Sequence, residues 1–353
     1  MSTKIIGSGS YIPKEKIENN QFLEHPFFME NGKRIQENGE NVISKFENIT
    51  GIKARRYISD EQSNSSIAYL AGKNAIEDAG VDPESIDCII VAHNFGDIIK
   101  GSFQTDIIPS IASRVKHKLG IKNPNCVPHD IIFGCPGWLQ GLIHAHSFLQ
   151  AGLHKRCLVI GAEVLSRILD PFDRDTMIFA DGAGSVVVES NNSDNGILSF
   201  SVASHAAEEL DYLSFGPSYN NFTGDKNFYI KMQGRKIYEY ALSKVPQAMK
   251  DCFDKSGLKI EDLSKILIHQ ANEKMDEAIV KRFYRSYGIN DIPENIMPMT
   301  IAELGNSSVA TIPTLYDLIC KGQLDLHKFK QGDVIMFASV GAGMNINAVV
   351  YRV

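Results

Sequence analysis

Hydrophobic residues recur along the chain with two kinds of spacing, one typical of helices and one typical of strands. From Asn64 to Gly80, apolar side chains stand three and four residues apart and the glycine closes the segment, so this spacing predicts a helix. The next apolar run, residues 86–94, is continuous rather than alternating. A short continuous run is typical of a strand covered on both faces.

Strands of this buried type recur in the segments VPHDIIF, RCLVIGAEV, KILIHQ and DVIMFASV. Because helical patterns separate them, the chain is expected to form parallel-rich sheets with helices on both faces. The pattern therefore predicts the α/β fold class.

Two pairs of segments indicate an internal duplication. Residues 77–91 align with residues 254–268, and residues 134–149 align with residues 305–320 in the same order. A chance likeness between helix-turn-strand segments is the alternative for either pair taken alone. Two pairs in one order favour duplication.

We therefore expect two similar α/β halves packed as one body, an N-terminal half over residues 1–190 and a C-terminal half over residues 195–353. Residues 22–48, which mix aromatic and charged side chains, fit neither half, and neither does the glycine-broken stretch 95–106. Long insertions of this kind are often lids or binding loops.

Composition narrows the classes of function. Hydrophobic residues make up 43% and charged residues 22% of the chain, the balance of a folded globular protein, and the net charge of -6 argues against a nucleic-acid binder. The N-terminal segment lacks the apolar core of a signal peptide, and no run approaches the roughly 20 apolar residues of a membrane span. We expect a cytoplasmic protein.

The cysteines are scattered without a CxxC pair, which favours reduced thiols over a disulfide framework or a metal site. Cys135 stands out because a strand-like run leads into it and an apolar helix follows, with Pro136 suited to the first helical position. The positive end of a helix favours a thiolate, the nucleophilic form. The alternative is a small buried hydrophobic residue.

Two further polar residues stand at the ends of predicted elements. His269 follows the strand KILI, and Asn306 stands at the start of another apolar helix. Alone, the first could be a structural histidine and the second a helix cap. With Cys135 they could converge between the two halves. The turn 340–343 could bring a backbone N–H to a substrate oxygen there, or it could be a plain hairpin turn.

The motifs GCPGW, HQAN, GNSS and a terminal GAG, in this order, resemble those of condensing enzymes of the β-ketoacyl-acyl-carrier-protein synthase III type, within the thiolase superfamily. The likeness extends over nearly the whole chain and includes TGI at residues 50–52 and DPFDRDTMIFADGAG at residues 170–184. It implies a thiolase-like duplicated fold, with the two halves packed as an αβαβα layered sandwich.

The resemblance also implies roles for the residues singled out above. Cys135 would take an acyl primer as a thioester, while His269 and Asn306 would assist loss of carbon dioxide from a malonyl-type extender on acyl carrier protein. The backbone N–H groups of Cys135 and Gly343 would form the oxyanion hole. This is a Claisen condensation in fatty acid or secondary lipid biosynthesis, and it needs no metal and no redox cofactor.

The family likeness further implies a homodimer, because the loop around Ile108 corresponds to one that crosses a dimer interface. The primer pocket would include Ile108, Trp138 and Met232. Acyl carrier protein would dock on the predicted helix 272–288 through the basic residues Lys274, Lys281, Arg282 and Arg285. The alternative is that these residues form an ordinary solvated helix face.

Three alternatives stay open. Ile49 and Lys45 replace residues that flank coenzyme A in relatives, which favours a primer bound to carrier protein. The motif GCPGW resembles that of a dialkylresorcinol or aryl-polyene branch, in which the extender would be a β-ketoacyl carrier-protein thioester. The protein could instead be a non-catalytic acyl-carrier-binding subunit. A nucleotide-binding enzyme would have to rest on the glycines at 7–10 or 181–184, neither of which opens a helix.

Overall fold

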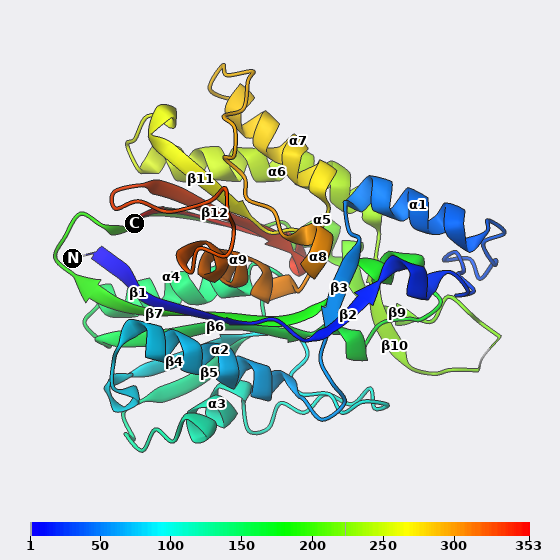
Figure 1. The fold of residues 1–353 in the computed structure, drawn as a ribbon, viewed down its shortest axis with the longest axis horizontal. Coiled ribbons are helices and arrows are strands. Elements are labelled where there is room, and N and C mark those ends of the chain that lie inside the picture. The colour runs from blue at the N-terminus through cyan, green and yellow to red at the C-terminus, as the bar shows by residue number, and fades with distance from the viewer. Residues whose placement is uncertain (1, 223) are drawn as a thin grey trace.

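The computed structural model describes residues 2–222 and 224–353, which form two main β-sheets with helices outside and between them (Figure 1). The first sheet has the strand order β1-β7-β6-β4-β5, and the second has the order β11-β12-β13-β8. The first comprises β1 (Ser2–Tyr11), β4 (Cys88–Ala92), β5 (Val127–Ile131), β6 (Arg156–Val164) and β7 (Asp181–Asn191). The second comprises β8 (Gly196–Ser204), β11 (Leu263–Ile268), β12 (Val334–Gly341) and β13 (Asn345–Arg352).

Helices form three layers around these sheets (Figure 1). One outer layer holds α2 (Asn64–Ala79) and α3 (Ile111–Leu119), and the other holds α6 (Gly234–Lys255) and α7 (Glu273–Arg285). Between the sheets lie α4 (Gly137–Gln150) and α9 (Thr311–Cys320). The predicted α/β class and the αβαβα layering are confirmed.

The two sheets repeat one pattern of pairing. In the first, β4 pairs parallel with β6, β6 antiparallel with β7, and β7 antiparallel with β1. In the second, β11, β12, β13 and β8 pair in the same senses and in the same spatial order. β4 and β11, in which the aligned segments 77–91 and 254–268 end, therefore occupy equivalent places.

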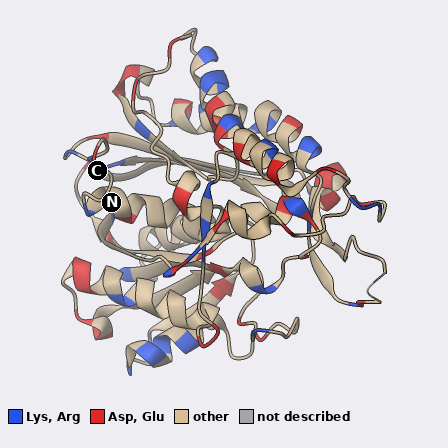
Figure 2. Ribbon diagram, turned by 45° about the vertical axis from the view of Figure 1, so that its right-hand side comes forward, with Lys and Arg blue, Asp and Glu red and all other residues tan. Residues whose placement is uncertain are grey.

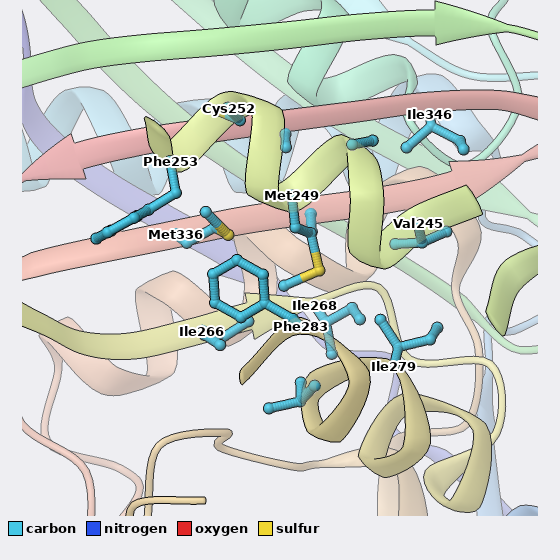
Figure 3. Packing of buried hydrophobic residues seen from close by; sticks show 14 of the residues in the cluster. Val245, Met249, Cys252, Phe253, Ile266, Ile268, Ile279, Phe283, Met336 and Ile346 are labelled. Carbon is cyan, nitrogen blue, oxygen red and sulfur yellow. The ribbon is translucent and has the colours of Figure 1, made fainter. Parts of the chain in front are cut away.

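Apolar side chains hold the helices against the sheets. Figure 3 shows the outer cluster in which α6 and α7 cover the second sheet, with Met249, Phe283 and Met336 packed together. The rings of Phe253 and Phe283 meet edge to face at 6.3 Å between centroids. Burial of such large side chains supplies the main favourable free energy of folding.

The glycines considered for nucleotide binding lie inside strands. Residues 7–10 belong to β1 and residues 181–184 to β7, and the two strands pair antiparallel, with Gly9 opposite Ser185. A phosphate-binding turn needs backbone N–H groups free at a helix start. The nucleotide-binding alternative is therefore wrong for these segments.

A smaller group of elements caps one side of the sandwich. It comprises β2 (Glu15–Glu18), α1 (Gly39–Thr50), β3 (Ala54–Tyr57), α5 (Ala206–Glu209), the hairpin β9 (Leu213–Pro217) and β10 (Phe228–Met232), and α8 (Ile301–Leu304). The insertion 22–48 contributes Phe27 and Phe46 to a buried cluster that also holds Phe179 and Ile230. Lys231 anchors the hairpin through its buried ion pair with Asp170.

No helix in the described part of the chain is both long enough and apolar enough to cross a membrane.

Candidate active site

Cys135 lies where the first sheet gives way to a central helix. The strand β5 ends at Ile131, and α4 begins at Gly137 with Pro136 as its N-cap, one position before the N1 place predicted for it. The residue is half-buried. The nucleophile candidate thus stands just before the N-terminus of a helix of 14 residues, as expected.

The thiol opens into a cavity of about 220 Å³. Its apolar walls come from separate elements, with Leu165 and Phe179 on the sandwich and Leu213 and Ile230 on the β9–β10 hairpin. The cavity is lined by Asn94, Phe95, Ile132, Gly134, Cys135, Leu165, Phe179, Leu213, Ser214, Phe215, Ile230, Ser308 and Ala342. Most of the lining is apolar and includes the thiol of Cys135, which suits a hydrocarbon chain linked to a reactive carbonyl.

The environment of the Cys135 thiol does not favour ionisation by itself. Burial raises its pKa to about 11, while the Ser308 hydroxyl, which donates a hydrogen bond to Sγ at 3.5 Å, lowers the pKa. Burial therefore opposes the ionisation expected from the helix N-terminus. Groups that stabilise the thiolate decide how reactive this cysteine is.

Asn306 lies two residues from Ser308 and is buried. Its backbone forms a bridge with Phe179, and its side-chain Oδ1 accepts a hydrogen bond from the Ser308 N–H at 2.8 Å. The sequence predicted that Asn306 starts the helix, but α9 begins five residues later, at Thr311. Because the carbonyl end of the amide is used by the backbone, the Nδ2 end is the one left to donate to a substrate.

His269 follows β11, and its backbone N–H donates to the carbonyl oxygen of Ala338 on β12 at 2.8 Å. The side chain is buried, and burial lowers its pKa to about 4. Its Nδ1 has no hydrogen-bond partner among the described residues. The imidazole is therefore neutral at physiological pH, and its protons are not committed to a carboxylate.

The turn after β12 packs closely against the segment that carries Cys135. A Cβ added to Gly134 would lie 2.6 Å from the backbone nitrogen of Ala342, and Ala342 lines the cavity. A Cβ added to Gly343 would instead meet the side chain of Asn345. Ala342 lies against Gly134 and lines the cavity, so its N–H is a second candidate for the oxyanion hole, and the role predicted for Gly343 stays a prediction.

Two of the three residues predicted for the primer pocket do not line the cavity. Trp138 is 1% exposed, and its indole N–H donates to the carbonyl of Val159 in the core between the sheets. Met232 packs partly buried against the cluster under the β9–β10 hairpin, whereas Ile230 lines the cavity. Ile108 is 85% exposed in this single chain, so its role in a dimer stays a prediction.

The residues predicted for docking lie exposed on α7, where Lys and Arg alternate with Asp and Glu (Figure 2). Lys274 and Lys281 border a groove of about 670 Å³ together with Glu277. Arg282 reaches α6 and donates to the carbonyl of Leu242 at 2.8 Å, and Arg285 is exposed at the last turn. Docking through this surface stays a prediction, because a solvated face has the same appearance.

Sequence reasoning missed several residues at the site. Asn94 and Glu163 join Ser308 in a hydrogen-bond network beside Cys135, and Phe95 and Phe215 stack at 5.1 Å between centroids where they border the cavity. Only Ser308 had a signal, as the last residue of GNSS. The described residues hold no cluster of three or more His, Cys, Asp or Glu side chains suited to a metal ion.

Comparisons with known proteins agree with this geometry. Residues 129–206 match the family model described as 3-oxoacyl-[acyl-carrier-protein (ACP)] synthase III, and residues 253–353 match its C-terminal model. A relative from Ehrlichia canis, beta-ketoacyl-[acyl-carrier-protein] synthase III, is 33% identical over 99% of this chain and 98% of its own. One of the same name from Rickettsia prowazekii is 31% identical over the full length of both.

Solved structures give the same picture. The crystal structure of 3-oxoacyl-[acyl-carrier-protein] synthase III from Aquifex aeolicus superposes with a TM-score of 0.79 at 30% identity, covering 99% of this chain and 100% of that one. The enzyme of that name from Pseudomonas aeruginosa superposes with a TM-score of 0.80 at 23% identity, which concerns the fold alone.

Proposed function

The chain belongs to the 3-oxoacyl-[acyl-carrier-protein] synthase III family of thiolase-fold condensing enzymes, and we propose that it joins a Cys135-bound acyl group to a carrier-protein-bound extender. The observation that carries this proposal is that the Cys135 thiol lines a largely apolar cavity together with Asn94 and Ser308, which form hydrogen bonds beside it. A thioester carbonyl can reach the sulfur while its hydrocarbon chain lies against the apolar lining.

In the first half-reaction, the Cys135 sulfur attacks the carbonyl carbon of an acyl thioester. A new carbon–sulfur bond forms, the bond to the donor sulfur breaks, and the donor leaves as a thiol with the proton lost from Cys135. The backbone N–H groups of Cys135 and Ala342 are proposed to stabilise the oxygen that becomes negative in the tetrahedral intermediate.

In the second half-reaction, a malonyl-type thioester loses carbon dioxide, and the electron pair of the broken bond forms an enolate. Neutral His269 and the Nδ2 of Asn306 are suited to donate hydrogen bonds to the enolate oxygen, because neither side chain carries a charge and Asn306 Oδ1 is already used. The enolate carbon then attacks the acyl carbonyl, a carbon–carbon bond forms, and the Cys135 thiolate is released.

The proposal includes the partners that the sequence predicted. An acidic acyl carrier protein would approach the α7 face, a second copy would place Ile108 near the cavity of its neighbour, and the enzyme would work in the cytoplasm without metal or redox cofactor. Long-range attraction by Lys274, Lys281 and Arg285 would speed encounter more than it would tighten the complex.

Intact-protein mass spectrometry after incubation with acyl-coenzyme A and acyl-carrier-protein panels tests the first half-reaction. Wild type is expected to gain one acyl mass, and Cys135→Ala is expected to gain none. Cys320→Ser is the matched control, since Cys320 is the exposed free cysteine outside the site. An adduct that survives in Cys135→Ala, or no adduct with any donor, contradicts the proposal, and the latter favours the non-catalytic binding subunit.

A further inference from the structure

We propose that Ser308 is a further catalytic residue, whose hydroxyl stabilises the Cys135 thiolate, and that Asn94 is the positioning residue that directs this hydroxyl at the sulfur. The inference rests on the proposed role of Cys135 as nucleophile. The contact itself is direct, since Ser308 Oγ donates to Cys135 Sγ at 3.5 Å. A hydroxyl donor to an anion is a charge-assisted hydrogen bond, which is stronger than a neutral one.

The backbone of Ser308 is held in an uncommon conformation. Its φ is 52°, in the left-handed region that residues other than glycine rarely occupy. Asn306 Oδ1 accepts the Ser308 N–H at 2.8 Å and helps to hold this conformation, and the side chain is buried. Strained residues persist where the surroundings fix them, and they concentrate at functional sites.

Asn94 fixes the direction of the Ser308 hydroxyl proton. Its Nδ2 donates to Ser308 Oγ at 3.3 Å, so the oxygen already accepts a hydrogen bond on that side. The hydroxyl proton cannot also point at Asn94, which leaves it directed towards the sulfur. Asn94 Oδ1 accepts the N–H of Gly134 at 3.0 Å, which sets the amide orientation and ties it to the turn that carries Cys135.

Glu163 anchors the other side of Asn94. Its carboxyl is fully buried on β6 and accepts both the Asn94 backbone N–H, at 3.1 Å, and the Asn94 side-chain amide. Burial raises the pKa of Glu163 to about 7, opposed by nearby His93 and reinforced by Asp181. When ionised, Glu163 raises the pKa of Cys135, so a donor at the sulfur is needed to counter both this charge and desolvation.

Alkylation of Cys135 by iodoacetamide, followed against pH, measures thiolate stability without any acyl donor. Peptide-resolved mass spectrometry separates Cys135 from the exposed Cys320. Ser308→Ala and Ser308→Gly are expected to displace the rising limb of the log-rate profile by about half to one pH unit to higher pH. Glycine tolerates the positive φ, so this variant separates the loss of the hydroxyl from backbone strain.

Ser307→Ala is the matched control, because its hydroxyl contacts Thr311 rather than the sulfur. Its profile is expected to coincide with wild type. A profile of both Ser308 variants that coincides with wild type, or an equal displacement in Ser307→Ala, overturns the inference.

A double-mutant cycle tests Asn94. Asn94→Ala alone is expected to displace the profile in the same direction, and in the Ser308→Ala background its effect should fall to less than half, because Asn94 acts through Ser308. Equal effects in both backgrounds overturn the positioning role. Since iodoacetamide is not a thioester, failure to load an acyl group and failure of this cycle are separate results.

Discussion

Gly341 and Cys135 are packed backbone against backbone. A Cβ added to Gly341 would lie 2.4 Å from the Cys135 nitrogen and 2.9 Å from the Cys135 Cβ. The last residue of β12 thus lies directly against the nucleophile at the start of the central helix. This contact joins the C-terminal sheet to the N-terminal half and places the neighbouring Ala342 at the cavity.

Gly341→Ala is expected to displace the Cys135 backbone, because the added Cβ would lie 2.4 Å from the Cys135 nitrogen, which is too close for two atoms that are not bonded to each other. Overpacking of this kind costs about 1–3 kcal/mol of unfolding free energy, and acyl loading should fall more than a hundredfold. Quenched time courses of acyl loading measure the loss of loading rate, and urea denaturation measures the loss of unfolding free energy. Gly234→Ala, where φ is not positive and an added Cβ would meet only Asp175 Oδ2 at 3.9 Å, controls for the substitution itself, and unchanged loading in Gly341→Ala would show that the contact is not needed.

The low pKa of His269, about 4, predicts how decarboxylation depends on pH. The imidazole stays neutral down to pH near 4, so the decarboxylation rate of a Cys135→Ala variant should show no step near pH 6.5, where an exposed histidine titrates. Carbon dioxide release from a malonyl carrier-protein thioester between pH 5 and 8 provides the measurement. A step near 6.5 that disappears in His269→Asn would contradict a neutral, buried His269.

Glu163 predicts a change of stability with pH. Its pKa is raised to about 7 in the fold from the ordinary value of 4.5, so the folded state binds more protons than the unfolded chain between these values. The contribution of Glu163 to the free energy of unfolding is present below pH 4.5 and is lost as the pH rises to 7. Glu163→Gln should therefore gain roughly 3 kcal/mol relative to wild type across this window, measured by urea denaturation at each pH. A difference in unfolding free energy between Glu163→Gln and wild type that stays constant with pH would contradict a raised pKa of the buried Glu163 carboxyl.

Removing the aromatic ring of Trp138 is expected to affect mainly stability, whereas removing that of Phe215 is expected to affect mainly the choice of acyl chain. Trp138 is 1% exposed in the core, so Trp138→Ala should cost about 3–5 kcal/mol of unfolding free energy, followed by circular dichroism. Phe215 is 46% exposed at the cavity, so Phe215→Ala should cost far less and should change the acyl chain length that loads Cys135 fastest. Matching losses of stability in the two variants would show that Phe215 is a core residue.

Sequence patterns predicted what depends on local spacing. The strand around residues 156–164 and the helix beginning at Asn64 follow from continuous and helical apolar runs, and Cys135 follows from a strand that leads into a helix. His269 follows from its place directly after an apolar strand, and the repeat singled out Asn306 by aligning it with Cys135. Each of these is a property of a few neighbouring residues.

Positions set by the packing of distant segments could not be predicted in the same way. Trp138 comes three residues after Cys135, but the helical turn between them directs its ring away from the cavity and into the core. Gly343 and Ala342 share one turn, and only the packing of Ala342 against Gly134 shows which of the two residues lies at the cavity. Asn94 and Glu163 meet across two strands, so no local pattern marks them.

In the proposed reaction, the acyl group on Cys135 becomes joined to a carbon atom of the extender. The direct measurement is a single turnover, in which enzyme preloaded with an acyl group receives malonyl carrier protein labelled with ¹³C at the free carboxyl. We expect discharge of the Cys135 adduct, release of labelled carbon dioxide and appearance of a β-ketoacyl carrier protein to proceed at one rate and in equal amounts. Discharge of the adduct without a carbon–carbon product, or discharge only by a β-ketoacyl carrier protein and without carbon dioxide, would contradict the proposed reaction.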